Sequence, residues 1–106
     1  MHLPRGHVAH IEERKIGEYL LSATHLVGRH KLRFFESVGF SRDRPEDLTA
    51  VLRVLALDGT VTRVLQSPHG TRYIVDGVVV SPAGAVVPLR TVWIADVPGA
   101  VPRFGG

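Results

Sequence analysis

The sequence predicts an α+β domain in which about three N-terminal helices pack on a C-terminal antiparallel sheet of three to four strands. Two observations support this class. Residues 11–58 repeat apolar side chains at spacings of three and four, whereas the residues after Gly59 alternate and are rich in β-branched side chains. A chain of 106 residues can bury a single core. We therefore expect one domain over residues 11–106, preceded by a flexible arm or an edge strand at residues 1–10.

Three stretches of the N-terminal half are predicted to be helical. The first begins near Ile11, and its apolar face consists of Ile16, Tyr19, Leu20 and Ala23. The second should run over residues 29–38, with Leu32, Phe35 and Val38 toward the core and Gly39 as its C-terminal cap. The third should run over residues 46–57, and its apolar stripe consists of Leu48, Val51, Leu52 and Leu55.

Strands are predicted in the C-terminal half at residues 60–66, 71–80 and 90–97. The turn between the last two contains Pro82 and Gly84, which fit a three-residue loop with a left-handed glycine. Such a loop pairs Ser81 with Ala85 and therefore places Asp76 opposite Arg90.

The strand register remains open at this point, because a two-residue loop is the alternative. That loop would place Thr91 opposite Ile74 and move Arg90 to the other face of the sheet. With the three-residue loop, one face carries Arg72, Ile74, Asp76, Arg90, Val92 and Ile94.

Composition excludes several function classes. The chain has no cysteine, which rules out disulfides, thiolate chemistry and cysteine-based zinc sites. His2, His7 and His10 lie on a segment without a rigid scaffold, so we expect no metal and no other cofactor. No apolar run approaches the roughly 20 residues of a membrane span, and the N-terminus lacks the apolar core of a signal peptide. We therefore expect a cytoplasmic protein with no membrane partner.

The segment from residue 19 to residue 40 is the first place to look for chemistry. It places His25, Arg29, His30, Lys31 and Arg33 between two apolar runs. An imidazole exchanges protons near neutral pH, and fixed cations neutralise the charge of phosphoryl oxygens. The chain also carries a net charge of +3, which permits a polyanionic partner such as RNA.

Several sequence blocks resemble a known family. These are H-x-V-G-R-H-K-x-R-F-F at 25–35, G-T-R-Y-x-V-D-G at 70–77, P-x-G at 82–84 and R-T-V-W-I at 90–94. They resemble an uncharacterised bacterial family catalogued as a domain of unknown function, number six-eight-eight-three. It occurs as free-standing proteins and as C-terminal modules of polymorphic toxins. The resemblance covers about residues 15–104. It implies an RNA-directed toxin on a barnase-like or RelE-like architecture, with a small cognate antitoxin or immunity protein as partner.

The polar residues that match the family pattern are His25, Arg29, Lys31, Arg33, Arg72, Asp76, Arg90 and Thr91. Two departures stand out. Relatives usually have Pro where this chain has Leu26, and they continue past Pro102-Arg103 with a short strand that carries Thr and Tyr. If that strand supplies a catalytic hydroxyl in the family, we expect this chain to lack it and to be inactive.

A metal-independent ribonuclease needs a base, an acid and cations around the phosphorane-like transition state. We expect His25 to be the acid or the base, with His30 as its substitute. Lys31 and Arg72 would stabilise phosphoryl charge, and Arg90 or Thr91 would orient the phosphate. The expected substrate-binding residues are Arg29, His30 and Arg33.

Each of these residues also has a plain structural explanation. The alternatives are that His25 is a hydrogen-bond partner at a helix end, that His30 is a solvated first-turn residue, and that Arg72 is a surface residue of a strand. Asp76 and Arg90 are expected to form a cross-strand ion pair. Phe34, Phe35 and Trp93 are expected in the core rather than as stacking platforms for bases. The alternative function is a non-catalytic protein- or RNA-binding module that uses the basic helix face and an uncapped last strand.

Overall fold

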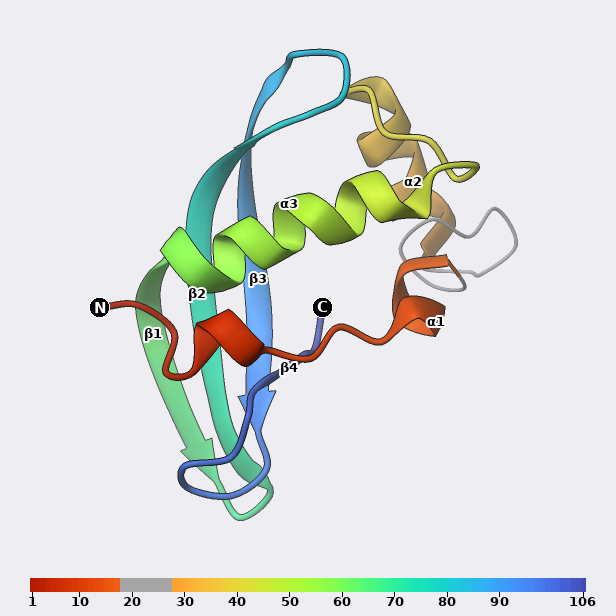
Figure 1. The fold of residues 1–106 in the computed structure, drawn as a ribbon. Coiled ribbons are helices and arrows are strands. Elements are labelled where there is room, and N and C mark those ends of the chain that lie inside the picture. The colour runs from red at the N-terminus through yellow and green to blue at the C-terminus, as the bar shows by residue number, and fades with distance from the viewer. Residues whose placement is uncertain (18–27) are drawn as a thin grey trace.

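The computed structural model describes residues 1–17 and 28–106, and the side chain of Arg29 lies outside that description. A four-stranded antiparallel sheet in the order β1-β2-β3-β4 forms one layer, and α3 crosses one of its faces (Figure 1). The helices precede the sheet along the chain. The α+β class predicted from the sequence is therefore confirmed.

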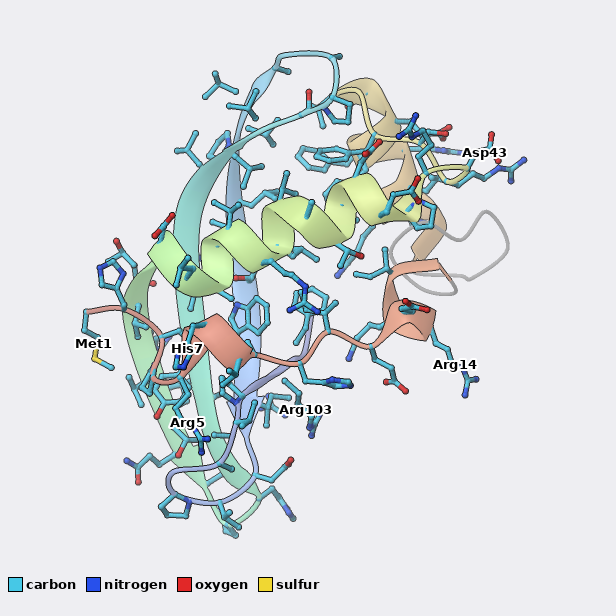
Figure 2. The ribbon with its side chains drawn as sticks, in the orientation of Figure 1. Met1, Arg5, His7, Arg14, Asp43 and Arg103 are labelled. Carbon is cyan, nitrogen blue, oxygen red and sulfur yellow. The ribbon has the colours of Figure 1, made fainter. Side chains whose placement is uncertain are left out.

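The first ten residues contact the body of the domain along their length. They contain the short 3-10 helix η1 (Gly6–Val8), and Leu3 and Ala9 are buried. Arg5 reaches the loop before β4, where its guanidinium donates to the carbonyl of Gly99 at 2.7 Å (Figure 2). His10 forms an isolated parallel bridge with Arg103. This segment therefore contributes to the core, and Arg5 and His10 bind the C-terminal residues 99–104.

The helices of the N-terminal half agree with the sequence pattern where they are described. The first predicted helix begins with α1 (Glu13–Lys15), and its residues Tyr19, Leu20 and Ala23 lie outside the described residues. The second is α2 (Gly28–Ser37), which buries Leu32 and Phe35. Gly39 has a φ of +104°, which confirms the predicted glycine cap. Within the described residues, none of the helices has the length and apolar character that crossing a bilayer requires.

Helix α3 (Pro45–Asp58) contributes one side of the core. Pro45 occupies its first turn, where a missing N–H costs nothing, and two acidic residues follow it. Its buried residues are Leu48, Leu52, Leu55 and Ala56. A Cβ at Gly77 of strand β2 would overlap the Leu55 side chain, so glycine at this position permits the close approach of helix and sheet.

The strands are β1 (Thr60–Ser67), β2 (Gly70–Val80), β3 (Val86–Ala95) and β4 (Arg103–Phe104). Asp76 lies opposite Arg90, so the three-residue loop is confirmed and the two-residue alternative is wrong. The predicted start of the third strand at Arg90 is also wrong. The pairing of β2 with β3 continues to Val80 and Val86, because the tight turn brings the two strands close together directly beside it.

The two faces of the sheet differ in what covers them. The face beneath α3 is apolar, and Val75, Val79, Val87 and Trp93 are buried there. The opposite face carries the Asp76–Arg90 pair, and Val78, Val80 and Val86 are more than half exposed near the hairpin tip. This difference follows from the alternation of side chains along a strand.

Candidate functional site

A pocket of about 320 Å³ lies where α2, β3 and the last residues of the chain meet. Helix α2 contributes His30, Lys31, Phe34 and Phe35 to its lining, and strand β3 contributes Leu89, Arg90 and Thr91. The remaining lining residues are Leu52, Phe104 and Gly106. The pocket therefore combines an apolar interior with an imidazole and an ammonium group, and it unites both halves of the chain.

Helical spacing brings His30 and Phe34 to the same side of α2, because residues four apart lie one turn from each other. His30 is exposed and Lys31 is half-buried. Phe34 is 44% exposed and meets Phe35 edge to face, with ring centroids 5.3 Å apart. The expectation that Phe34 belongs to the core is therefore wrong, since it lies beside the buried stripe of α2 and not on it.

The Arg90 side chain is held on the open face of the sheet. Its Nε donates to Asp76 Oδ1 at 2.8 Å and its Nη2 donates to Oδ2 at 2.9 Å. This bidentate pair of hydrogen bonds lowers the pKa of Asp76, an effect that desolvation of the carboxylate opposes. The Arg90 side chain is 70% exposed, so the pair contributes little to stability. The predicted cross-strand ion pair is confirmed.

The backbone of Arg90 faces the edge of the sheet. Val92 donates its N–H to the carbonyl of Gly106 at 3.0 Å and accepts the N–H of Gly105 at 2.7 Å. Alternate residues of a strand direct their N–H and C=O groups to the same side, so Arg90 directs its own groups the same way as Val92. On β3, strand β4 pairs with Trp93 and Ile94. Within the described residues, no strand therefore covers this edge at Arg90.

Thr91 is buried, and its hydroxyl already has two partners. The Oγ1–H donates to the carbonyl of Val75 at 2.9 Å, and the indole Nε1–H of Trp93 donates to Thr91 Oγ1 at 2.8 Å. The hydroxyl has only one proton to donate. Its observed role is to satisfy the polar groups of β2 and of the buried indole.

Residues 2–105 match the protein-family model described as Domain of unknown function (DUF6883). The chain belongs to this family. A comparison with curated proteins and one with solved structures gave no match. The likeness to barnase or RelE therefore stays a prediction. The matched residues include every residue that lines the pocket of this DUF6883 domain except Gly106.

The structure brings together four of the predicted site residues and leaves others elsewhere. His30, Lys31, Arg90 and Thr91 all line the pocket. Arg72 lies on the open face opposite Ile94, four residues along β2 from Asp76. At about 3.3 Å per residue, these two positions are about 13 Å apart.

Three further predicted site residues are not found among the described residues that line the pocket. Arg33 is exposed on α2 and does not line the pocket. His25 lies outside the described residues, as does the side chain of Arg29. Among the described residues, no three His, Asp or Glu side chains gather closely enough to hold a metal ion.

Sequence reasoning did not find the apolar lining of the pocket. Phe34 was detectable from its position one turn after His30. Leu89 was detectable as the residue that precedes Arg90 in the sequence. Leu52 and Phe104 are buried and reach the pocket through tertiary packing, for which the local sequence contains no signal.

Proposed function

We propose that this chain is a toxin-type, metal-independent endoribonuclease that binds RNA in the pocket between α2 and β3. The single observation that supports this proposal best is the convergence of His30 and Lys31 with residues of β3. An imidazole and an ammonium group beside an apolar interior suit a nucleotide, whose base is flat and apolar and whose phosphate is anionic.

The proposed reaction is an internal transesterification. A base removes the proton of the ribose 2′-hydroxyl, and the resulting oxygen attacks phosphorus. The bond between phosphorus and the 5′-oxygen breaks, and an acid protonates that leaving oxygen. The products are a 2′,3′-cyclic phosphate and a 5′-hydroxyl. His30 would serve as the acid or the base, and Lys31 would stabilise the charge on the phosphoryl oxygens.

His25 is the second imidazole in this proposal, because two titratable groups are needed for the two proton transfers. It belongs to the family pattern that the sequence matches. Arg29 and Arg33 follow on the same stretch and would steer the RNA backbone toward the pocket. Arg72 lies on the open face of the sheet and would contact more distant phosphates.

An exposed aromatic ring further supports single-stranded RNA as the substrate. Phe34 is 44% exposed at the pocket, where an unpaired base would stack on it. Bases in a duplex are already stacked and paired, so duplex RNA would have to open first. We therefore propose single-stranded regions as the cleavage sites.

The resemblance to toxin modules supplies the biological context of the proposal. A ribonuclease made by a bacterial cell requires control, so we propose a small antitoxin or immunity protein as its partner. The proposed location is the bacterial cytoplasm, where the RNA targets are found.

Incubation of the purified protein with single-stranded RNA in the presence of a chelator tests the proposal. We expect fragments with cyclic-phosphate ends, and we expect Lys31→Ala to cut at least about tenfold more slowly than wild type. Arg42→Ala is the matched control, because Arg42 is an exposed arginine that does not line the pocket, and this variant should cut nearly as fast as wild type. Intact RNA after incubation with folded wild-type protein would reject the nuclease.

A second candidate function is a non-catalytic protein- or RNA-binding module. It is favoured by the existing partners of two predicted catalytic groups. The guanidinium of Arg90 already donates to Asp76, and the hydroxyl of Thr91 already donates to the carbonyl of Val75. RNA that binds the pocket with wild-type affinity but is never cut would support this candidate.

A further inference from the structure

The pocket lies at the point along β3 where pairing with the C-terminal residues ends. Strand β4 and the two residues after it bond to β3 as far as Val92. The next residue that faces this edge is Arg90, whose N–H and C=O lie beside the pocket that Arg90 lines. Within residues 1–17 and 28–106, these two backbone groups have no hydrogen-bond partner. An extended chain supplies donors and acceptors at the spacing of such an edge.

The available edge is short. Pro88 is the next residue that faces it, and proline has a carbonyl but no N–H. The ladder that this edge can form therefore uses the N–H and C=O of Arg90 and the C=O of Pro88. The pocket volume of about 320 Å³ is likewise that of a small ligand site and not of a long groove. Both observations fit a few extended residues.

The residues that line the pocket determine which side chains the bound segment should carry. Along a strand, every second side chain points to the same face. One side chain of an added strand would therefore enter the pocket and meet Phe34, Phe35 and Leu52. His30 and Lys31 line the same pocket, and the whole chain carries a net charge of +3. An apolar side chain flanked by carboxylates complements this arrangement.

We propose that an extended acidic segment of a partner protein adds to β3 at Arg90, in line with β4, with one apolar side chain in the pocket. The geometry is that of strand addition, in which backbone hydrogen bonds give affinity and the pocket gives specificity. Binding of this segment does not rest on the proposed ribonuclease. If the ribonuclease is correct, the segment occupies the RNA pocket and inhibits cleavage.

The test uses the whole protein and a short synthetic peptide that alternates glutamate and leucine. Fluorescence anisotropy measures its affinity, and hydrogen exchange followed by NMR measures protection of the Arg90 amide. We expect the peptide to bind at least about tenfold more tightly than its lysine counterpart and to slow exchange at Arg90 by about tenfold or more. A peptide with N-methylated backbone nitrogens should lose binding, because it cannot form the ladder.

Two pairs of variants locate the binding site. Phe34→Asp should weaken binding by about tenfold or more, whereas Val54→Asp, at an apolar position of α3 that is slightly more exposed, should not. Lys31→Glu should weaken binding more than Arg33→Glu does. Circular dichroism confirms that each variant is folded.

Four outcomes would overturn the proposal. They are equal binding of the acidic and lysine peptides, full binding of the N-methylated peptide, unchanged binding by Phe34→Asp, and no binding at millimolar peptide. Protection of the Arg90 amide by a second copy of the chain, seen as a dependence on protein concentration, would also overturn it. Protection by a single-stranded RNA alone would assign the pocket to nucleic acid and reject the peptide.

Discussion

The two halves of β3 have the same backbone conformation and opposite surroundings. At Trp93 the strand is covered by β4, the indole is fully buried, and its N–H bonds to Thr91. At Arg90 the edge has no strand neighbour among the described residues, and the side chain is exposed. The change occurs where the pairing with the C-terminal residues ends. The distant C-terminal segment thus sets where the backbone edge of β3 is covered, whereas the exposure of the Arg90 side chain follows from its place on the open face of the sheet.

The largest effect on stability is expected in the covered half. Trp93→Ala removes a fully buried indole and should lower the free energy of unfolding by about 3–5 kcal/mol, measured by urea denaturation. Val86→Ala in the same strand is the control, since Val86 is 70% exposed and should cost under about 0.5 kcal/mol. Similar losses for the two variants would contradict the contrast between the two halves of β3.

The largest effect on activity is expected beside the uncovered half. His30→Ala should lower the rate of RNA cleavage by about 10²-fold or more, because it removes a general acid or base. Its free energy of unfolding should change little, because His30 is exposed. His10→Ala is the matched control outside the pocket. An unchanged cleavage rate in His30→Ala would remove this histidine from the mechanism.

Thr91 joins the two halves, and its replacement separates a structural role from a catalytic one. Thr91→Val keeps the shape but leaves the indole N–H of Trp93 without its partner and removes the hydroxyl's hydrogen bond to the carbonyl of Val75. We expect a loss of about 1–3 kcal/mol in urea denaturation, and recovery of most of it in Thr91→Ser. The cleavage rate per folded molecule should stay near wild type. A large loss of that rate in a folded Thr91→Val protein would show that the hydroxyl acts on substrate.

The smallest expected effect concerns the pH dependence of the Asp76–Arg90 pair. The hydrogen bond from Arg90 lowers the pKa of Asp76 below its ordinary value of 3.8. A lowered carboxyl pKa adds stability that is present above that value and is lost as pH falls through the folded-state pKa. The difference in unfolding free energy between wild type and Asp76→Asn should therefore shrink on acidification below about pH 4. A difference that grows on acidification would contradict the pair.

Local signals in the sequence were sufficient for much of the fold. The repeat of apolar residues predicted helices at 29–38 and 46–57, and the structure has them at Gly28–Ser37 and Pro45–Asp58. Turn residues at 82–84 predicted the register that pairs Asp76 with Arg90. These features depend on neighbours in the sequence, which is why periodicity and turn chemistry reveal them.

The remaining features depend on contacts between distant segments. The uncapped last strand expected from the sequence is wrong over Trp93 and Ile94, because β4 pairs there. A two-residue strand has too little alternation to be recognised from its own sequence. The place of Phe34 beside residues of β3 in the pocket likewise depends on the packing of distant segments. For the candidate site, the sequence predicted the polar residues but not the apolar interior that they border.

NMR mapping of a single-stranded RNA whose 2′-hydroxyls are methylated, so that it cannot be cleaved, is the decisive experiment for RNA binding in the pocket. We expect the amide shifts to concentrate on α2 around His30 and Phe34 and on β3 around Arg90. Shifts confined to the open face around Arg63 and Arg72, with the pocket unperturbed, would contradict it.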